Sequence, residues 1–299
     1  MIVNRHATSM TGTVIDLAVR TLAGLVELEV ERTGYRGHAR DLAAATRADL
    51  IIVHGGDGSI NETVNGMMGR DDGQPLLAVI PGGGANVLAR ALGLPVDAAV
   101  AIRRLRELIE AGRYRTIGLG RAADRYFTFS AGLGLHAEVV REVERLRAEG
   151  RRETAALFLR AALGRYYLGT GRRRPVLTLE RDGEPPVTGL AEAIITNRSP
   201  WTYLRSRPLL PVPNPDFNSG LDLLALRRLR LTTIVSTGGQ MLYVRSRPPR
   251  GRQILSVLGG ETLSVRSARP VAFQADGEYL GVIEAVKFQF VPRALRVMA

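Results

Sequence analysis

The sequence predicts a two-domain α/β protein, with a parallel sheet in the N-terminal domain and a mainly antiparallel, β-rich C-terminal domain. The chain has 299 residues, which is long for one domain and enough for two cores. Up to residue 118, short apolar runs alternate with amphipathic stretches, a pattern typical of βαβ units. From residue 119, β-rich runs are separated by turn dipeptides such as Asp182-Gly183, which favours antiparallel strands.

The predicted N-terminal domain spans residues 1–118, and the tail from about 291 to 299 is expected to return to it. Its two clearest strands are 49–53 and 76–80, which are short, aliphatic and followed by glycines. A helix is expected after each glycine-rich segment. The expected helices are 12–31, 60–68, 85–92 and 97–111.

The predicted C-terminal domain spans residues 119–290 and begins with a β-rich run, followed by a long, arginine-rich helical stretch over about 136–168. Prolines predict loops at 205–215 and 245–252, and the second loop is strongly basic. The expected strands are 126–129, 175–180, 190–196, 221–226, 262–266, 270–275 and 283–290.

Composition excludes several classes of site. The chain has no cysteine, which excludes disulfides, thiolate metal sites and cysteine nucleophiles. Its single lysine, Lys287, follows no glycine-rich loop, so a Walker A loop is excluded. The sequence has no apolar run long enough for a membrane span and begins without the apolar core of a signal peptide. We therefore expect a cytoplasmic protein with no transmembrane segment.

The formal charge is +12, and nearly all of the basic side chains are arginines. Such arginines can bind nucleic acid phosphates or an anionic membrane surface, or can simply form a solvated surface. Two stretches are candidates for contact with anionic headgroups of a membrane: the arginines at 141–152 and the basic loop at 245–252. Aromatic residues make up only 5% of the chain, which disfavours a single-strand binder, and we expect no nucleic acid partner.

The segment Gly55-Gly56-Asp57-Gly58-Ser59 lies between a predicted strand and a predicted helix. Glycines permit a sharp turn and close approach of a ligand, and the amides of a helix start bind anions. Ser59 is expected to cap the helix. A carboxylate beside phosphates needs a cation between them, so Asp57 predicts Mg²⁺. The alternative is a tight turn in which Asp57 caps the helix.

A second glycine-rich segment, 81–86, also follows a strand and precedes a helix. Successive loops of this kind lie at the same carboxyl edge of a parallel sheet, where ligands bind. The two segments are therefore expected to hold one phosphate chain from two sides.

Four segments of the sequence resemble those of a known family. The segment 54–66 (HGGDGSINETVNG) closely resembles the nucleotide loop of the diacylglycerol kinase catalytic-domain family, which includes bacterial diacylglycerol kinases, related lipid kinases and sphingosine kinases. The segment 81–95 (PGGGANVLARALGLP) is similar to the second motif of that family. The segment 129–134 (FSAGLG) and Asp276-Gly277-Glu278 also match, in an order and spacing that cover nearly the whole chain.

The resemblance implies a fold like that of NAD kinases and phosphofructokinases, with ATP and Mg²⁺ between the domains. It implies transfer of the γ-phosphate to a lipid hydroxyl at the inner face of the membrane, an activity of phospholipid biosynthesis. The residues expected at the nucleotide are Asn4, Thr33, Gly55, Gly56, Asp57, Gly58, Ser59, Glu62, Gly83, Gly84 and Asn86, with Asp57 at the metal.

The same resemblance places the catalytic base in the pair Asp276 and Glu278. Transfer to an alcohol needs a group that accepts the hydroxyl proton. The pair lies at a turn between two predicted strands. Residues two apart in an extended segment share a face, so the two carboxylates can act together if the turn allows it, and pairing can raise one pKa. The alternative is an ordinary Asp-Gly hairpin turn.

Several positions depart from the family pattern. Gly84, Val87 and Gly118 stand where the family has threonine, aspartate and aspartate. His136 replaces an acidic residue, and Ser219 replaces the aspartate of a structural Mg²⁺ site in bacterial relatives. We expect His136 to be packed or solvent-facing, not a ligand. These substitutions leave fewer carboxylates to bind magnesium than the family pattern has.

Two alternatives to the lipid kinase stay open. NAD kinases share Gly-Gly-Asp-Gly, although Asn197-Arg198 is the nearest counterpart to their later asparagine-acid pair. A nucleotide-binding regulator without catalysis is favoured by the lost carboxylates and opposed by Asp276 and Glu278. The identity of the lipid is not readable from the sequence, and a homodimer is left open.

Overall fold

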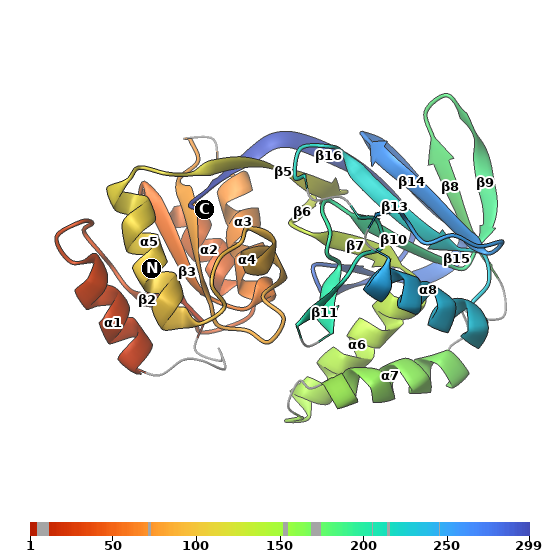
Figure 1. The fold of residues 1–299 in the computed structure, drawn as a ribbon, viewed down its shortest axis with the longest axis horizontal. Coiled ribbons are helices and arrows are strands. Elements are labelled where there is room, and N and C mark those ends of the chain that lie inside the picture. Colours follow the sequence, from red (N-terminus) through yellow and green to blue (C-terminus); the bar gives the residue numbers. More distant parts are fainter. Residues whose placement is uncertain are drawn as a thin grey trace. The chain divides into compact units, whose positions relative to one another are not determined.

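The computed structural model describes residues 1–4, 12–70, 73–151, 155–168, 175–204, 206–213, 216–244 and 246–299. The chain divides into two compact units (Figure 1). Unit 1 comprises Met1–Leu119 and Pro292–Ala299, and unit 2 comprises Gly120–Val291. Unit 1 has α-helices and parallel strands and unit 2 is rich in antiparallel strands, which confirms the predicted fold class.

The sheet of unit 1 is parallel and runs in the order β2-β1-β3-β4. Its strands are β1 (Ile2–Val3), β2 (Glu31–Arg32), β3 (Leu50–Gly55) and β4 (Leu76–Pro81). The last five residues of both β3 and β4 are buried, which explains their continuous aliphatic sequence. Beyond β4 the C-terminal tail adds a parallel pairing between Val297 and Leu77.

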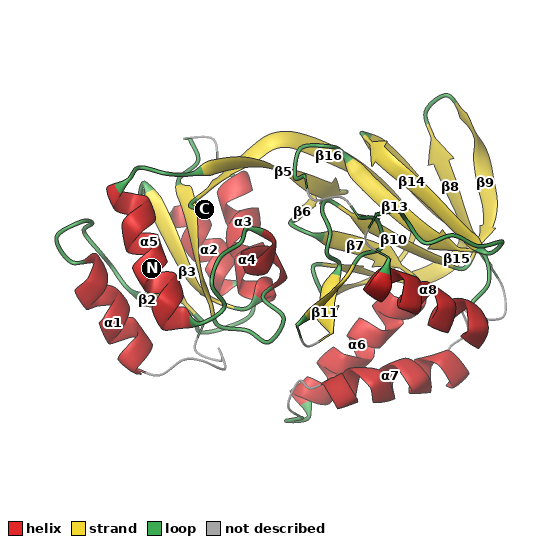
Figure 2. Ribbon diagram, viewed as in Figure 1, coloured by secondary structure: helices red, strands yellow, loops and turns green. Residues whose placement is uncertain are grey.

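Helices pack on the strands of unit 1 (Figure 2). They are α1 (Gly12–Leu22), α2 (His38–Ala45), α3 (Asp57–Met68), α4 (Val87–Ala91) and α5 (Ala98–Glu110). Asp97 caps α5, since its Oδ1 accepts a hydrogen bond from the N–H of Val100 at 2.9 Å. The predicted helix 12–31 is too long, because α1 ends at Leu22 and Gly24 follows with a φ of 79°.

The main sheet of unit 2 has the strand order β14-β13-β10-β7-β15-β16, and each neighbouring pair is antiparallel. β8 extends from β15 and β9 from β8, while β5 pairs with β6 and β11 with β12. The strands that lie wholly or partly in unit 2 are β5 (Arg115–Ala122), β6 (Arg125–Phe127), β7 (Ser130–Leu133), β8 (Leu177–Arg181), β9 (Glu184–Leu190), β10 (Glu192–Thr196), β11 (Thr202–Leu204), β12 (Arg207–Leu209), β13 (Leu221–Leu226), β14 (Ile254–Gly260), β15 (Thr262–Ala275) and β16 (Glu278–Val297); β5 begins and β16 ends in unit 1.

The core of unit 2 brings aromatic side chains from distant strands together. The rings of Phe127 and Phe273 both meet the ring of Phe288 edge-on, with centroids 6.3 Å apart in each pair. Aliphatic residues of β7, β10 and β13 complete this cluster. The predicted strands 262–266 and 270–275 are a single strand, β15, with an irregular register against β16 between Arg266 and Val271.

Three helices accompany the strands of unit 2: α6 (Leu135–Ala148), α7 (Ala155–Leu168) and α8 (Leu231–Tyr243). The expected helical stretch 136–168 contains two helices, because α6 ends before Gly150, which has a φ of 83°, and α7 begins at Ala155. The sequence did not predict α8, and the expected loop 205–215 contains β12. Arg152 and Arg245, which were named for the basic stretches, lie outside the described residues. No helix in the described part of the chain is long and apolar enough to span a membrane.

Candidate active site

The first glycine loop forms the junction between β3 and α3. β3 ends at Gly55 and α3 begins at Asp57, with Gly56 as the extended residue before the helix. A Cβ atom on Gly55 would lie 2.8 Å from the Cβ of Ser59, so only glycine fits there. The first turn of α3 presents backbone N–H groups and the positive end of the helix dipole, which together favour an anion.

Ser59 does not cap α3, which corrects the sequence-based expectation. It lies within the first turn of the helix, because the helix begins three residues earlier than predicted. Its hydroxyl accepts a hydrogen bond from the side-chain amide of Asn4 at 2.7 Å. Asn4 itself continues β1, since its N–H donates to the carbonyl of His54 at 3.0 Å. The Asn4–Ser59 bond therefore joins the end of β1 to the loop.

The two glycine loops touch each other backbone to backbone. The N–H of Gly82 donates to the carbonyl of Gly55 at 2.9 Å. A Cβ atom on Gly83 would lie 2.7 Å from the Cα of Gly56, a distance that real Cβ atoms essentially never show. Only glycine fits at position 83, and a Cβ atom on Gly56 would lie 3.3 Å from the Cα of Gly83, so the close approach of the loops favours glycine at both positions.

Asn86 gives the second loop its shape. It has a φ of 48°, and its Oδ1 accepts from the N–H of Gly83 at 2.9 Å. Its Nδ2 donates to the carbonyl of Gly83 at 2.8 Å, which closes a small ring. Gly84 lies on the exposed side of this loop, and a Cβ atom there would meet no atom within 4 Å. The side chain of Asn86 is thus engaged by the loop.

Asp57 joins the first loop to the helix that follows the second loop. Its Oδ1 accepts a hydrogen bond from the N–H of Leu88, in the first turn of α4, at 3.2 Å. The carboxylate therefore caps α4, whereas the sequence suggested its own helix as the alternative role. Val87, which stands where the family has aspartate, is buried in the same turn.

Thr33 and Glu62 lie around the start of α2. Thr33 is buried, and its N–H donates to the carbonyl of Val3 at 2.9 Å. The Oε1 of Glu62 accepts from the N–H of Gly37 at 2.9 Å, just before α2 begins. Glu62 therefore satisfies a donor at the α2 N-terminus and connects α3 to α2.

In unit 2, Asp276 and Gly277 form the two-residue turn between β15 and β16. Their φ values are 47° and 76°, and Ala275 pairs with Glu278 across the turn. Two consecutive positive φ values identify a type I′ hairpin turn, for which Asp-Gly is a preferred sequence. The Asp-Gly hairpin turn, which was the alternative for this tripeptide, is therefore present, and the two carboxylates do not share the face of an extended segment.

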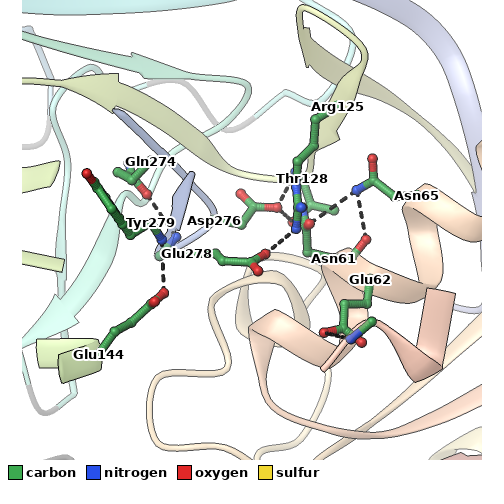
Figure 3. A network of polar contacts seen from close by, with 12 residues as sticks. Asn61, Glu62, Asn65, Arg125, Thr128, Glu144, Gln274, Asp276, Glu278 and Tyr279 are labelled. Carbon is green, nitrogen blue, oxygen red and sulfur yellow. Dashed lines mark hydrogen bonds and ion pairs between the residues drawn. The ribbon is translucent and has the colours of Figure 1, made fainter. Parts of the chain in front are cut away.

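The carboxylate of Asp276 is buried and accepts four hydrogen bonds, and Figure 3 shows it beside one of the donors, Thr128. Oδ2 accepts from the N–H and the hydroxyl of Thr128 at 2.6 and 2.8 Å. Oδ1 accepts from the N–H groups of Phe129 and Ser130, both at 3.0 Å. Burial raises the pKa of Asp276, and the four donors act in the opposite direction. Asp276 thus fastens the turn to the segment before β7.

Glu278 has a different environment. Its carboxylate forms an ion pair with Arg125, and 15% of its side chain is exposed. The next residue, Tyr279, donates its N–H to Glu144 at 2.9 Å, so the start of β16 is held against α6. Of the two carboxylates that were predicted together, Glu278 is the one that is open to solvent.

A series of contacts between buried polar side chains connects the start of α6 to this turn. Glu192 accepts from the N–H groups of Leu135 and His136 at 2.6 and 3.1 Å and forms a short contact with Nδ1 of His136. Nε2 of His136 lies 3.3 Å from the amide of Gln274, whose Oε1 accepts from the N–H of Gly277 at 2.9 Å. His136 is therefore a packed residue that links Glu192 to the turn.

Sequence reasoning missed the partners that hold this turn. Thr128 and Arg125 contact Asp276 and Glu278 across about 150 residues of sequence, as the separations of 148 and 153 residues show. Asn197 adds a bond from its side-chain amide to the carbonyl of Thr128 at 3.1 Å. No local pattern marks these residues. The one usable signal is the proximity of Thr128 to the recognised segment 129–134.

The residues of unit 1 suit a nucleotide phosphate better than a preformed metal centre. The α3 N-terminus and the glycine loops provide backbone donors with little side-chain bulk. Within the described ranges, no three His, Asp or Glu side chains converge on a potential metal position. Mg²⁺ commonly needs only one or two carboxylates besides phosphate oxygens, and Asp57 is the carboxylate that the first loop supplies.

Near Ser219, the second position considered for a metal, the polar groups bind one another. The hydroxyl of Ser219 donates to the carbonyl of Asp216 at 3.3 Å. The Oδ1 of buried Asp222 accepts from the N–H of Gly259 at 2.9 Å. This segment is a turn stabilised by side chains.

Comparison with known proteins agrees with the motifs. Residues 1–121 match the family model described as diacylglycerol kinase catalytic domain. A diacylglycerol kinase of Bacillus subtilis (strain 168) is 42% identical over 106 residues, which cover 36% of this chain and 34% of that protein. The match thus spans about a third of the relative's length.

Solved structures extend the likeness of the fold to the whole chain. A crystal structure of a diacylglycerol kinase from Bacillus anthracis str. Sterne has a TM-score of 0.71 and 21% identity, covering 99% of this chain and 94% of that one. An NAD kinase from Archaeoglobus fulgidus in complex with ATP has a TM-score of 0.53 and 13% identity, covering 100% and 92%. At such identities the likeness concerns the fold alone. The match of residues 1–121 to the diacylglycerol kinase catalytic-domain model confirms the resemblance that the motifs predicted.

Proposed function

We propose that the protein is an ATP-dependent lipid kinase that transfers the γ-phosphate of ATP to a lipid hydroxyl at the cytoplasmic face of the membrane. The observation that carries the proposal is the contact between the two glycine loops at the N-terminus of α3, where the backbone of Gly56 leaves no room for a side chain at Gly83. Two touching loops of this kind, beside a helix N-terminus, favour a phosphate chain. The family of residues 1–121 supplies the reaction class.

Each unit contributes a different part of this chemistry. In unit 1, the backbone from Gly55 to Ser59 binds phosphates, and Asp57 is the residue that would hold Mg²⁺. When bound, Mg²⁺ supplies charge neutralisation for the phosphate oxygens. In unit 2, Glu278 takes the proton of the lipid hydroxyl while that oxygen bonds to the γ-phosphorus and the bond to ADP breaks.

Glu278 is a better candidate for the base than Asp276. The four hydrogen bonds to Asp276 occupy both of its oxygens, so its carboxylate is a poor proton acceptor for an incoming hydroxyl. Glu278 is partly exposed and Arg125 orients it. We therefore divide the predicted pair into a positioning residue, Asp276, and a base, Glu278.

A nucleotide-binding regulator is the second candidate. The observation that favours it is Val87, a buried apolar residue in the turn where the family has aspartate. A third outcome, NAD kinase activity, is suggested by the shared fold with the NAD kinase structure.

A radiolabelled ATP assay separates these three functions. The wild type, Asp57→Ala and Glu278→Gln would be incubated with ATP labelled at the γ-phosphate and with a panel of diacylglycerols and sphingoid bases in mixed micelles. Lipid labelling by the wild type that both changes strongly reduce supports the proposal. ATP binding without transfer favours the regulator, and labelling of added NAD favours the NAD kinase.

A further inference from the structure

Helix α8 and its flanks carry no acidic residue. Between Asp222 and Glu261 the sequence contains seven arginines and no aspartate or glutamate. The helix itself, Leu231–Tyr243, has no charged side chain. The seven arginines precede and follow the helix and are Arg227, Arg228, Arg230, Arg245, Arg247, Arg250 and Arg252.

One face of α8 is anchored to unit 2. Ile234 packs against a buried cluster that includes Leu226 and Leu229, and Thr237 and Met241 are buried. The carbonyl of Met241 also accepts the N–H of Leu210 at 3.0 Å. Because this inner face is fixed, the opposite face has a defined orientation.

The exposed side of the helix carries apolar side chains beside the uncharged hydroxyls of Thr232 and Ser236. Leu231 and Val235 lie one turn apart, with 48% and 64% of their surface exposed. Tyr243, at the end of the helix, is 71% exposed. Single exposed aliphatic residues are common, but an uncharged helix that presents such a stripe marks an interaction surface.

The basic segment after α8 is held close to the helix. Gln240 binds the backbone of Arg250 twice, accepting its N–H at 2.9 Å and donating to its carbonyl at 3.1 Å. The guanidinium of Arg207 lies 5.5 Å from the centre of the Tyr243 ring. Arg228 and Arg230, before the helix, and Arg247, Arg250 and Arg252, after it, are exposed. Positive charge therefore stands at both ends of the apolar stripe.

We propose that α8 docks on an anionic lipid bilayer. Leu231 and Val235 enter the boundary between headgroups and acyl chains, and the arginines at both ends bind lipid phosphates. A surface helix with an apolar face and flanking basic residues has the properties of an interfacial helix. A nucleic acid would use the arginines but not the aliphatic stripe, and its binding is an outcome that would overturn the proposal.

The test measures binding of the full-length protein to large unilamellar vesicles by co-sedimentation, without nucleotide. One set of vesicles contains only phosphatidylcholine, and the other contains phosphatidylcholine with about one third phosphatidylglycerol. Because no ATP is present, the result does not depend on kinase activity. We expect the protein to bind anionic vesicles about tenfold more strongly than neutral vesicles, or better, since each arginine near an anionic surface strengthens binding about fivefold.

Two variants test the two parts of the surface. The double change Leu231→Ser with Val235→Ser should weaken binding to anionic vesicles about tenfold, because it removes the apolar stripe. Changing Arg247, Arg250 and Arg252 to Gln should weaken it about a hundredfold.

Matched controls change similar residues elsewhere. Val282→Ser alters a valine of β16 that is 55% exposed, and the triple control replaces Arg103, Arg113 and Arg115 of unit 1, all exposed, with Gln. Both controls should bind vesicles like the wild type, and all variants should keep the wild-type Tm.

The proposal is overturned if the wild type does not bind vesicles, or if it binds neutral and anionic vesicles equally. It is also overturned if neither the double serine variant nor the triple glutamine variant binds more weakly than the wild type. Competition by duplex DNA, with no effect of the serine changes, would overturn it as well. Loss of binding on changing Leu159 and Leu163 of α7 to Ser, with the α8 variants unaffected, would place the surface on α7 instead.

Discussion

The carboxylate of Asp57 accepts a hydrogen bond from the backbone N–H of Leu88 at 3.2 Å, so a residue of the first glycine loop caps the helix that follows the second. This bond connects two segments that are 31 residues apart in the sequence. Asp57 therefore has a structural role in addition to the metal-binding role that the sequence suggests, and substitution can separate the two.

Replacement of Asp57 by Asn and by Ala should give different results. Asparagine keeps a side-chain oxygen for the N–H of Leu88, so the free energy of unfolding should stay within about 0.5 kcal/mol of the wild type. Alanine removes the cap and should cost about 1 kcal/mol. If the charge holds Mg²⁺, both variants lose phosphate transfer. Full transfer by Asp57→Asn, measured with saturating Mg²⁺, would show that the charge is not needed.

Gly83→Ala should disrupt the contact between the glycine loops. The new Cβ atom would lie 2.7 Å from the backbone of Gly56, which cannot rotate away as a side chain could. We expect a loss of about 1–3 kcal/mol in stability and weaker ATP binding, measured by chemical unfolding and calorimetry.

Gly84→Ala is the matched control for this change, because a Cβ atom at Gly84 meets no atom within 4 Å. It should unfold like the wild type. If Gly83→Ala and the wild type bind ATP with equal affinity, the contact between the loops is not needed for phosphate binding.

Asp276→Asn should destabilise unit 2. The carboxylate accepts four donors, and an amide group in its place would direct its own N–H groups at two of them. The expected loss is about 2–3 kcal/mol in the free energy of unfolding. The change Asp182→Asn, in the exposed turn between β8 and β9, is a control that should cost nothing measurable. Wild-type stability of Asp276→Asn would contradict the positioning role.

The contact between α6 and α7 should weaken in acid. Hydrogen bonds from Arg145 and Arg165 lower the pKa of Glu142 from 4.5 to about 2. A carboxyl whose pKa is lower in the folded than in the unfolded state stabilises the fold above the unfolded pKa. That contribution is lost as the pH falls from about 4.5 to about 2.

The comparison of wild type with Glu142→Gln isolates this effect. The wild type should be more stable by about 0.5–1 kcal/mol at pH 6, and the difference should vanish near pH 2. Thermal unfolding at a series of pH values measures it. A difference that stays constant over this range would contradict the role of the ionised carboxylate.

Much of the first loop could be predicted from the sequence, because its determinants are local. Aliphatic runs followed by glycines define β3 and β4, and the parallel order brings their carboxyl ends together. The register of Gly55 opposite Pro81 then places both loops at one edge. The helix start was misplaced by a few residues, and for that reason Ser59 was wrongly assigned as a cap.

Helix α8 could not be recognised because its local preferences favour other structures. Its 13 residues include five β-branched residues and two glycines, which lower helix propensity. Packing of the partly buried Ile234 against Leu226 and Leu229, together with the burial of Met241, compensates for this deficit. Tertiary packing, which is invisible in a local window, decides the conformation.

The partners of the Asp276 turn were missed for a related reason. Thr128 and Arg125 reach this turn only after β7 pairs with β15. Glu192 and His136 likewise meet because β10 pairs with β7. These pairings join segments far apart in the chain, so no spacing rule within a motif could reveal them.

The most direct test of the account is the rate of γ-phosphate transfer from ATP to a lipid hydroxyl by Glu278→Gln. Glutamine preserves the shape of the side chain and can still contact Arg125, while it removes the proton acceptor. We predict a kcat lowered by about 10²–10⁴-fold, with ATP affinity and Tm close to the wild type. A kcat within a few-fold of the wild type would contradict the assignment of Glu278 as the base.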